Sequence, residues 1–155
     1  MRVLKVKIDL NADTAETMVT IQAPELTAEV EEIYRQLQEL SERPNQLECY
    51  KNELTYYLNL DDILFLETEG RQVVAHTKGN SFSVNYKLYE LEKLLSWQFM
   101  RVSKSTILNL KQVYALTRSI SNCQVHFRDS YKVVYVSRRY YHNLSDKLNE
   151  RRSLS

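Results

Sequence analysis

Glycine is almost absent from the chain, and this scarcity limits both the turns and the chemistry that the sequence can support. The 155 residues contain only 2 Gly, Gly70 and Gly79, and only 2 Pro. A dinucleotide-binding G-x-G-x-x-G sequence requires three glycines, and a P-loop requires two before its Lys-Ser/Thr pair. Gly70 and Gly79 fit neither pattern, which argues against nucleotide chemistry built on a glycine-rich loop. Both instead lie between strand-like segments, where a tight turn needs a positive φ.

The remaining catalytic patterns are also missing. The three histidines, His76, His126 and His142, have no metal-ligand spacing in the sequence. A G-x-S-x-G nucleophile sequence does not occur. Glu67 and Glu69 flank a turn and could do acid–base work, but the sequence places no His or metal cluster beside them. We therefore expect no enzyme activity, no catalytic residues, no metal, no cofactor and no small-molecule substrate.

The expected compartment is the cytoplasm. No apolar run of about 18 residues or more occurs, and the stretch from Met1 to Leu10 alternates charged and apolar residues, unlike a signal peptide. Cys49 and Cys123 are too far apart for a C-x-x-C motif. A reduced pair is the simpler interpretation, while a single disulfide stays open from the sequence.

Charge divides the chain unevenly. Residues 1–44 hold five basic and nine acidic residues, a net charge of −4, whereas residues 45–155 hold sixteen and eleven, a net charge of +5. Within 97–140 the only acid is Asp129. The basic residues of that stretch are Arg101, Lys104, Lys111, Arg118, Arg128, Lys132, Arg138 and Arg139. Such a run is either a solvated face or the electrostatic footprint of a nucleic-acid-binding protein.

The acidic N-terminal part predicts two strands and a helix. Apolar and charged residues alternate over 4–10, and 19–21 is a second short strand candidate. Thr27 is a helix cap, and Pro44 ends the helix. Its apolar stripe is Val30, Ile33, Leu37 and Leu40. A unit this small is not expected to be stable alone. The stripe therefore packs either on its own strands or against a second copy in a helical seam.

The rest of the chain predicts mostly strands. The strand candidates are 50–60, 63–66, 73–77, 82–84, 113–117, 124–127 and 132–136. Two helices are predicted, one over 88–95 with Asn85 as its cap and one over 138–150. The intervening stretch 99–113 has no clean periodicity.

Four sequence blocks follow one another in this part of the chain. They are Ile63–Glu67 with Val73–Thr77, then Leu88–Glu92, Phe99–Asn109 and Val136–Tyr140. In the same order they resemble the "I-x-F-I-E … V-x-V-H-T", "L-x-x-L-E", "F-x-R-V-H-R-S-x-I-V-N" and "V-S-R-R-Y" blocks of the LytTR DNA-binding domain. The resemblance covers roughly residues 47–150. Any one block is weakly specific, and the four in order are strongly specific.

The sequence departs from the family pattern at two points. Ser103 stands where the family usually has His, which puts in doubt any DNA contact assigned to that His. Asp129-Ser130 stands where the last hairpin usually has Asp-Gly, which suggests a looser turn. Residues 1–44 are too few for the receiver domain that often precedes LytTR domains, and they resemble the short leader of stand-alone LytTR regulators.

The resemblance implies a mostly β fold, α+β at the level of the chain. An elongated β-sheet domain with short helices would occupy residues 45–155, after a strand-strand-helix extension over 1–44 that serves oligomerisation or regulation. In this family, loops between strands enter successive major grooves, and such a groove admits a β-ribbon or loop as well as a helix.

Carried over position by position, the resemblance implies one set of DNA-binding residues. Those expected to read bases are Arg71, Lys104 and Arg138, and those expected to contact phosphates are Ser105, Arg128 and Arg139. Arg101 belongs to the central block, but an ion pair inside the domain explains it equally well. Asn109 is expected to bond backbone within a turn rather than DNA.

The predicted function is that of a sequence-specific transcriptional regulator. The resemblance implies double-stranded DNA as partner, with imperfect repeats bound by a homodimer, and a membrane-protein inhibitor encoded nearby. The alternative is a protein-interaction module, an anti-regulator with a LytTR-like scaffold that does not itself bind DNA.

Overall fold

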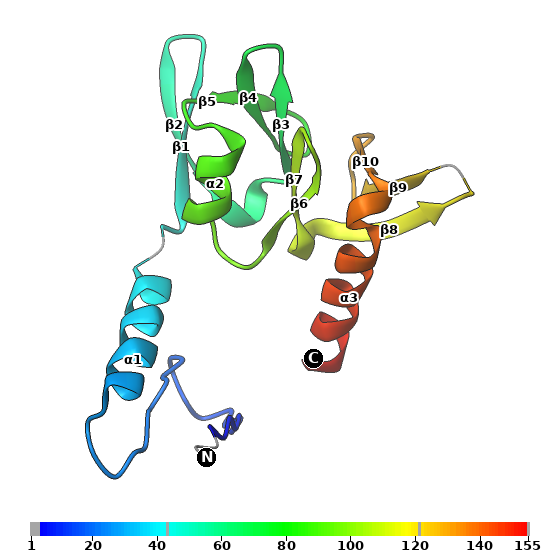
Figure 1. The fold of residues 1–155 in the computed structure, drawn as a ribbon. Coiled ribbons are helices and arrows are strands. Elements are labelled where there is room, and N and C mark those ends of the chain that lie inside the picture. Colours follow the sequence, from blue (N-terminus) through cyan, green and yellow to red (C-terminus); the bar gives the residue numbers. More distant parts are fainter. Residues whose placement is uncertain (1–3, 43, 121, 155) are drawn as a thin grey trace. The chain divides into compact units, whose positions relative to one another are not determined.

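A computed structural model describes residues 4–42, 44–120 and 122–154 of the chain (Figure 1). Four residues of the predicted extension over 1–44, residues 1–3 and 43, lie outside the described residues, as does residue 121. The chain divides into two compact units, Met1–Ser41 and Glu42–Ser155. Each unit is considered by itself.

The first unit contains the predicted helix. Helix α1 spans Ala28–Ser41, and the main-chain N–H of Val30 donates to Thr27 Oγ1 over 3.2 Å. This bond satisfies one of the N–H groups that the first turn of a helix leaves without a partner. Glu29 and Glu31 lie in the same turn, at the positive end of the helix dipole. The helix ends at Ser41, before Pro44.

The two predicted strands of this unit are wrong. No strand occurs between residues 4 and 27, although the alternation of apolar and charged residues is regular there. Val6 and Leu10 are 85% and 89% exposed. Alternation predicts a strand only where a neighbouring strand accepts its backbone hydrogen bonds and a core covers its apolar side. Within the part of the chain that the structure describes, no strand pairs with residues 4–10 and no core covers their apolar side chains.

The second unit contains a seven-stranded sheet. Its strands are β1 (Gln46–Lys51), β2 (Leu54–Asn59), β3 (Phe65–Glu69), β4 (Gln72–His76), β5 (Ser81–Val84), β6 (Phe99–Ser103) and β7 (Thr106–Asn109). Their order is β2-β1-β5-β4-β3-β7-β6, and every neighbouring pair is antiparallel. The stretch without periodicity in the sequence therefore forms β6 and β7.

A three-stranded sheet and two helices complete the unit. The strands are β8 (Val113–Arg118), β9 (Cys123–Phe127) and β10 (Val133–Val136), in the order β10-β9-β8. Helix α2 spans Leu88–Leu94 and α3 spans Arg138–Leu154, with 3-10 turns at Leu60–Asp62 and Leu110–Gln112. Asn85 is not the cap of α2, because the N–H of Lys87 donates to Glu90 Oε1 at 3.0 Å and the helix begins after Lys87.

Strand β3 lies between two hydrophobic cores. Consecutive residues of a strand point to opposite faces. Leu66 accordingly joins a core that α2 covers, while Phe65 joins a core shared with the three-stranded sheet and α3. On the neighbouring strand β7, Ile107 and Leu108 divide in the same way. The chain thus forms a mostly β fold with short helices, as the sequence predicts.

Candidate nucleic-acid interface

Two backbone hydrogen bonds join the three segments that carry the predicted base-reading residues. The N–H of Thr68, next to the β3–β4 turn, donates to the carbonyl oxygen of Ser105 over 2.9 Å. The N–H of Ser137 donates to Val102 O over 2.9 Å and fixes the start of α3 beside β6. The β3–β4 hairpin, the β6–β7 turn and the first residues of α3 are therefore consecutive neighbours in space.

Each of these segments exposes one predicted base-reading residue. Arg71 follows Gly70, whose φ of +65° forms the β3–β4 turn. Lys104 lies at the tip of the β6–β7 turn, and Arg138 is the first residue of α3. All three are exposed. The structure thus brings together segments more than thirty residues apart in the sequence.

Arg101 stabilises the β6–β7 turn by donating hydrogen bonds to its main-chain carbonyl groups. Its Nε donates to Ser103 O over 2.8 Å, its Nη2 donates to Lys104 O, and its Nη1 lies 2.9 Å from Glu92 Oε1 on α2. Hydrogen bonds to three different residues hold the guanidinium group of Arg101 in one orientation. The ion pair inside the domain is therefore the role that the geometry supports for Arg101.

Ser103, which replaces the family histidine, also supports this turn. Its hydroxyl accepts from the N–H of Ser105 at 3.2 Å, and the two hydroxyls are 3.4 Å apart. A serine that bonds the backbone two residues on favours a tight turn. Ser105 is half-buried, whereas the other two predicted phosphate contacts, Arg128 and Arg139, are exposed.

The remaining predicted phosphate contacts stack on tyrosines. The guanidinium carbon of Arg128 lies 4.3 Å from the centre of the Tyr114 ring, and that of Arg139 lies 5.6 Å from the Tyr140 ring. Stacking restricts an arginine side chain while its N–H groups stay free to donate. Both residues are exposed, so their N–H groups can reach an anionic partner.

Several basic residues of the positive stretch are already neutralised, and the proposed contacts are not. Lys111 lies 3.6 Å from Asp61, and Arg101 pairs with Glu92. Within the described residues, five proposed contacts form no ion pair with a carboxylate; they are Arg71, Lys104, Arg128, Arg138 and Arg139. Their positive charge is therefore available to an external anion.

Arg118 is a residue that the sequence prediction left out of the site. Its guanidinium carbon lies 4.1 Å from the centre of the Tyr141 ring, and it shares a small surface pocket with Arg138 and His142. Arg138 Nη2 donates to Ile120 O across the same pocket at 3.2 Å. Only its position in the positively charged stretch 97–140 could have indicated Arg118 from the sequence, because it lies in none of the four blocks.

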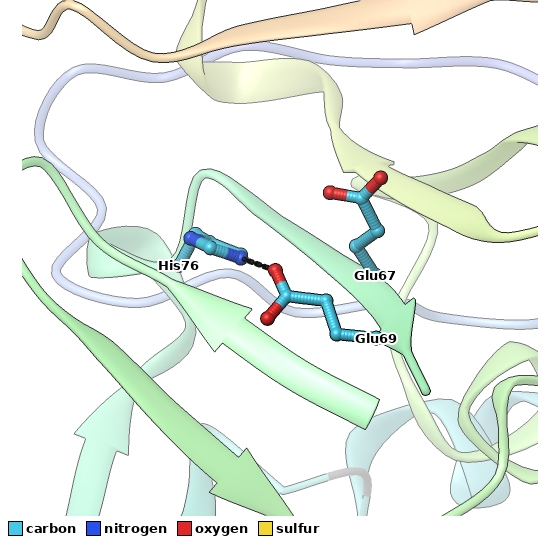
Figure 2. A group of neighbouring side chains, drawn as sticks. All are labelled: Glu67, Glu69 and His76. Carbon is cyan, nitrogen blue, oxygen red and sulfur yellow. Dashed lines mark hydrogen bonds and ion pairs between the residues drawn. The ribbon is translucent and has the colours of Figure 1, made fainter. Parts of the chain in front are cut away.

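The expectation that no histidine accompanies Glu67 and Glu69 is wrong. Strand pairing brings His76 beside them, and its Nε2 lies 2.9 Å from Glu69 Oε1, as Figure 2 shows. Burial lowers the pKa of His76, although its hydrogen bond to Glu69 acts in the opposite direction. Burial also raises the pKa of Glu67, and the charge of Glu69 adds to this. These three side chains could hold a metal ion.

A family model and a solved structure indicate the same family. Residues 53–149 match the family model described as the LytTr DNA-binding domain. A solved LytTr DNA-binding domain from Bacillus cereus superimposes with a TM-score of 0.62 at 18% identity, covering 66% of this chain and 95% of that one. This structural likeness concerns the fold.

Relatives in Staphylococcus aureus are similar over nearly the whole chain. An uncharacterized HTH-type transcriptional regulator of strain COL is 27% identical over 147 residues, covering 94% of this chain and 99% of the relative. Its counterpart in the bovine strain RF122 / ET3-1 is 26% identical over the same lengths. Their description names a helix-turn-helix, whereas no two α-helices are consecutive in the described part of this chain.

None of the described helices is long and apolar enough to cross a membrane.

Proposed function

The chain belongs to the LytTR DNA-binding family, and from this premise we propose that it is a transcriptional regulator that reads successive major grooves with its loops. This is a family of DNA-binding regulators and not a class of enzymes. The observation that carries the groove-reading part is the pair of backbone bonds from Thr68 to Ser105 and from Ser137 to Val102. These bonds bring together the three segments that carry the exposed cationic residues Arg71, Lys104 and Arg138.

The six proposed contact residues divide into two roles. Arg71 and Arg138 lie on a turn and at a helix start, where a guanidinium extends far enough to bond a guanine edge with two N–H groups. Lys104 offers a single charged donor at the turn between them. Arg128 and Arg139 are stacked on tyrosines, and Ser105 is half-buried, an arrangement suited to phosphates that hold the register.

The test compares specific with nonspecific DNA. The wild-type protein first selects a duplex from a random-sequence library, and binding is then measured on that duplex and on an unselected one. Arg71→Ala and Arg138→Ala should each cost about 1–3 kcal/mol on the selected duplex and much less on the other. Arg128→Ala and Arg139→Ala should weaken binding to both and reduce the slope of log affinity against log salt by about one unit.

Lys93, an exposed lysine of α2, provides the matched control. Lys93→Ala should leave both affinities nearly unchanged, because none of the proposed contact residues lies on α2. Equal losses on both duplexes for Arg71→Ala and Arg138→Ala would reduce these residues to phosphate contacts. Failure of the wild type to select any duplex would favour the interaction module that does not bind DNA.

For the first unit, a second copy of the chain is the proposed partner. No residue of α1 is buried, and Val30, Ile33 and Leu37 are only half-covered along one stripe. This spacing suits a two-helix seam. Leu37→Glu should then give a folded monomer in size-exclusion chromatography, with weaker cooperative binding to repeated sites. An unfolded product would instead indicate that the stripe packs within its own chain.

A further inference from the structure

The β3–β4 hairpin gathers three metal-ligating side chains on one face. Phe65 pairs with His76 across the two strands, and Glu67 and Glu69 follow Phe65 at two-residue intervals, so all four share a face. The ligand atoms of Glu67, Glu69 and His76 lie within 4.8 Å of one another (Figure 2). Phe65 also stacks on the His76 ring, with the ring centres 4.3 Å apart and an interplanar angle of 12°. The imidazole is therefore fixed in orientation before any ion arrives.

The carboxylate of Glu67 has no partner. The Glu67 side chain is half-buried, and its carboxylate makes no hydrogen bond or ion pair with any other residue that the structure describes. The neighbouring carboxylate of Glu69 bonds the His76 imidazole, with the charge of Lys132 nearby. A cation held between the two carboxylates would give Glu67 the partner that a half-buried charge needs.

We propose that Glu67, Glu69 and His76 bind one divalent first-row transition-metal ion, through His76 Nε2 and an oxygen of each carboxylate. One nitrogen and two oxygens form a donor set that suits Zn²⁺ or Mn²⁺. Three protein ligands leave further coordination positions to water, which can reach the site at the exposed Glu69. The residues lie on paired strands, which hold them more firmly than a loop does.

The ammonium group of Lys132 competes with a metal ion for the imidazole of His76. Its Nζ lies 3.2 Å from His76 Nδ1 and 2.6 Å from the carbonyl oxygen of Asn80. An ammonium has no lone pair, so it donates to Nδ1, and the imidazole proton stays on Nε2, facing Glu69. A metal ion at Nε2 requires the other tautomer, with the proton on Nδ1. Lys132 would then turn fully to Asn80 O, and the neutral imidazole would lose no proton to solvent.

The test is metal titration of the metal-free full chain near neutral pH, without DNA, so its outcome does not depend on the proposed function. Isothermal calorimetry with Mn²⁺ and with Zn²⁺ should show one ion per chain. Glu67→Gln and His76→Gln should each weaken binding by about tenfold or more, as the loss of a ligand requires. Lys132→Met should strengthen binding, because it removes the competing ammonium.

His126→Gln is the matched control, since this half-buried strand histidine bonds Thr117 and not an acidic pair. It should bind the ion as the wild type does. Co²⁺ absorption separates this site from Cys49 and Cys123, because thiolate ligands produce charge-transfer bands that nitrogen and oxygen ligands do not. Unchanged affinity in Glu67→Gln, or a thiolate band in the wild type, would overturn the proposal. Glu67→Gln preserves the side-chain shape and gives this answer even if His76→Gln does not fold.

Discussion

Arg101 and Glu92 form an ion pair that links the β6–β7 turn to α2, with Nη1 and Oε1 2.9 Å apart. The same guanidinium donates to two main-chain carbonyls of the turn that presents Lys104. Only 23% of the Arg101 side chain is exposed, against 41% for Glu92. Loss of Arg101 therefore removes two hydrogen bonds to the main chain as well as the ion pair, whereas loss of Glu92 removes the ion pair alone.

We expect Arg101→Ala to lower the free energy of unfolding by about 1–3 kcal/mol, because it leaves carbonyl groups of a part-buried turn without their donor. Glu92→Gln should cost at most about 1 kcal/mol, the usual value of an exposed ion pair. Arg101→Lys should not restore stability, because one ammonium cannot replace a planar guanidinium. Urea denaturation of the three variants checks this order, and equal losses for Arg101→Ala and Glu92→Gln would contradict it.

Asn109 is expected to be the most sensitive polar residue of the fold. It is fully buried; its Nδ2 donates to Ile63 O at 2.8 Å and to Leu60 O at 3.2 Å, and its Oδ1 accepts from Lys111 N at 3.0 Å. This confirms that its side chain bonds the backbone. Asn109→Ala should destabilise the fold by about 1–3 kcal/mol, because buried backbone groups lose their partners.

Asn59→Ala is the control for this prediction. Asn59 is exposed on β2 and accepts one bond, from Gln46 Nε2 at 3.2 Å. Its replacement should change stability by no more than about 0.5 kcal/mol, as is usual for surface positions. A thermal-unfolding series in which both variants behave alike would show that the Asn109 contacts contribute little.

Local patterns predicted the strands whose two faces differ clearly. Cys123, Val125 and Phe127 are buried on β9 while Gln124 and His126 are only half-buried, so the alternation was visible in the sequence. On β7 all four residues are buried, and the period of two disappears because both faces of the strand meet a core. A strand of this kind is not distinguishable from other apolar stretches by periodicity.

The site was predictable only where sequence blocks carried it. Arg71 and Arg138 follow from the resemblance, whereas the contact of His76 with Glu69 depends on the register of β3 and β4 and on the direction in which Glu69 leans. The seven-residue spacing between Glu69 and His76 specifies neither the strand register nor the direction of the Glu69 side chain. Lys132 reaches the same histidine from the segment between β9 and β10, a contact that only the tertiary fold creates.

The β1–β2 turn offers a stabilising substitution. Lys51 pairs with Leu54, so Asn52 and Glu53 form a two-residue loop, and their φ angles are +50° and +66°. Such loops favour Asn followed by Gly, because a side chain in the left-handed region is strained. Glu53→Gly should raise the free energy of unfolding by about 0.5–1 kcal/mol. Glu48→Gly, the same change within β1, should lower it by a similar amount, and a loss of stability in both variants would contradict the turn assignment.

Cys49 should make the fold sensitive to alkali. Its side chain is fully buried, and burial, with a smaller contribution from the charge of Glu48, raises the pKa of the thiol from 9.0 to about 11. The folded state therefore retains a proton that the unfolded chain releases. The stabilisation from this group is complete below the unfolded pKa and is lost as pH rises from about 9 to about 11, by roughly 2–3 kcal/mol. Denaturant unfolding of wild type and Cys49→Ala across this range isolates the effect from the titration of tyrosines and lysines, which both proteins share. The difference in stability between the two should shrink with rising pH, whereas a constant difference would show that the thiol does not titrate as its burial requires.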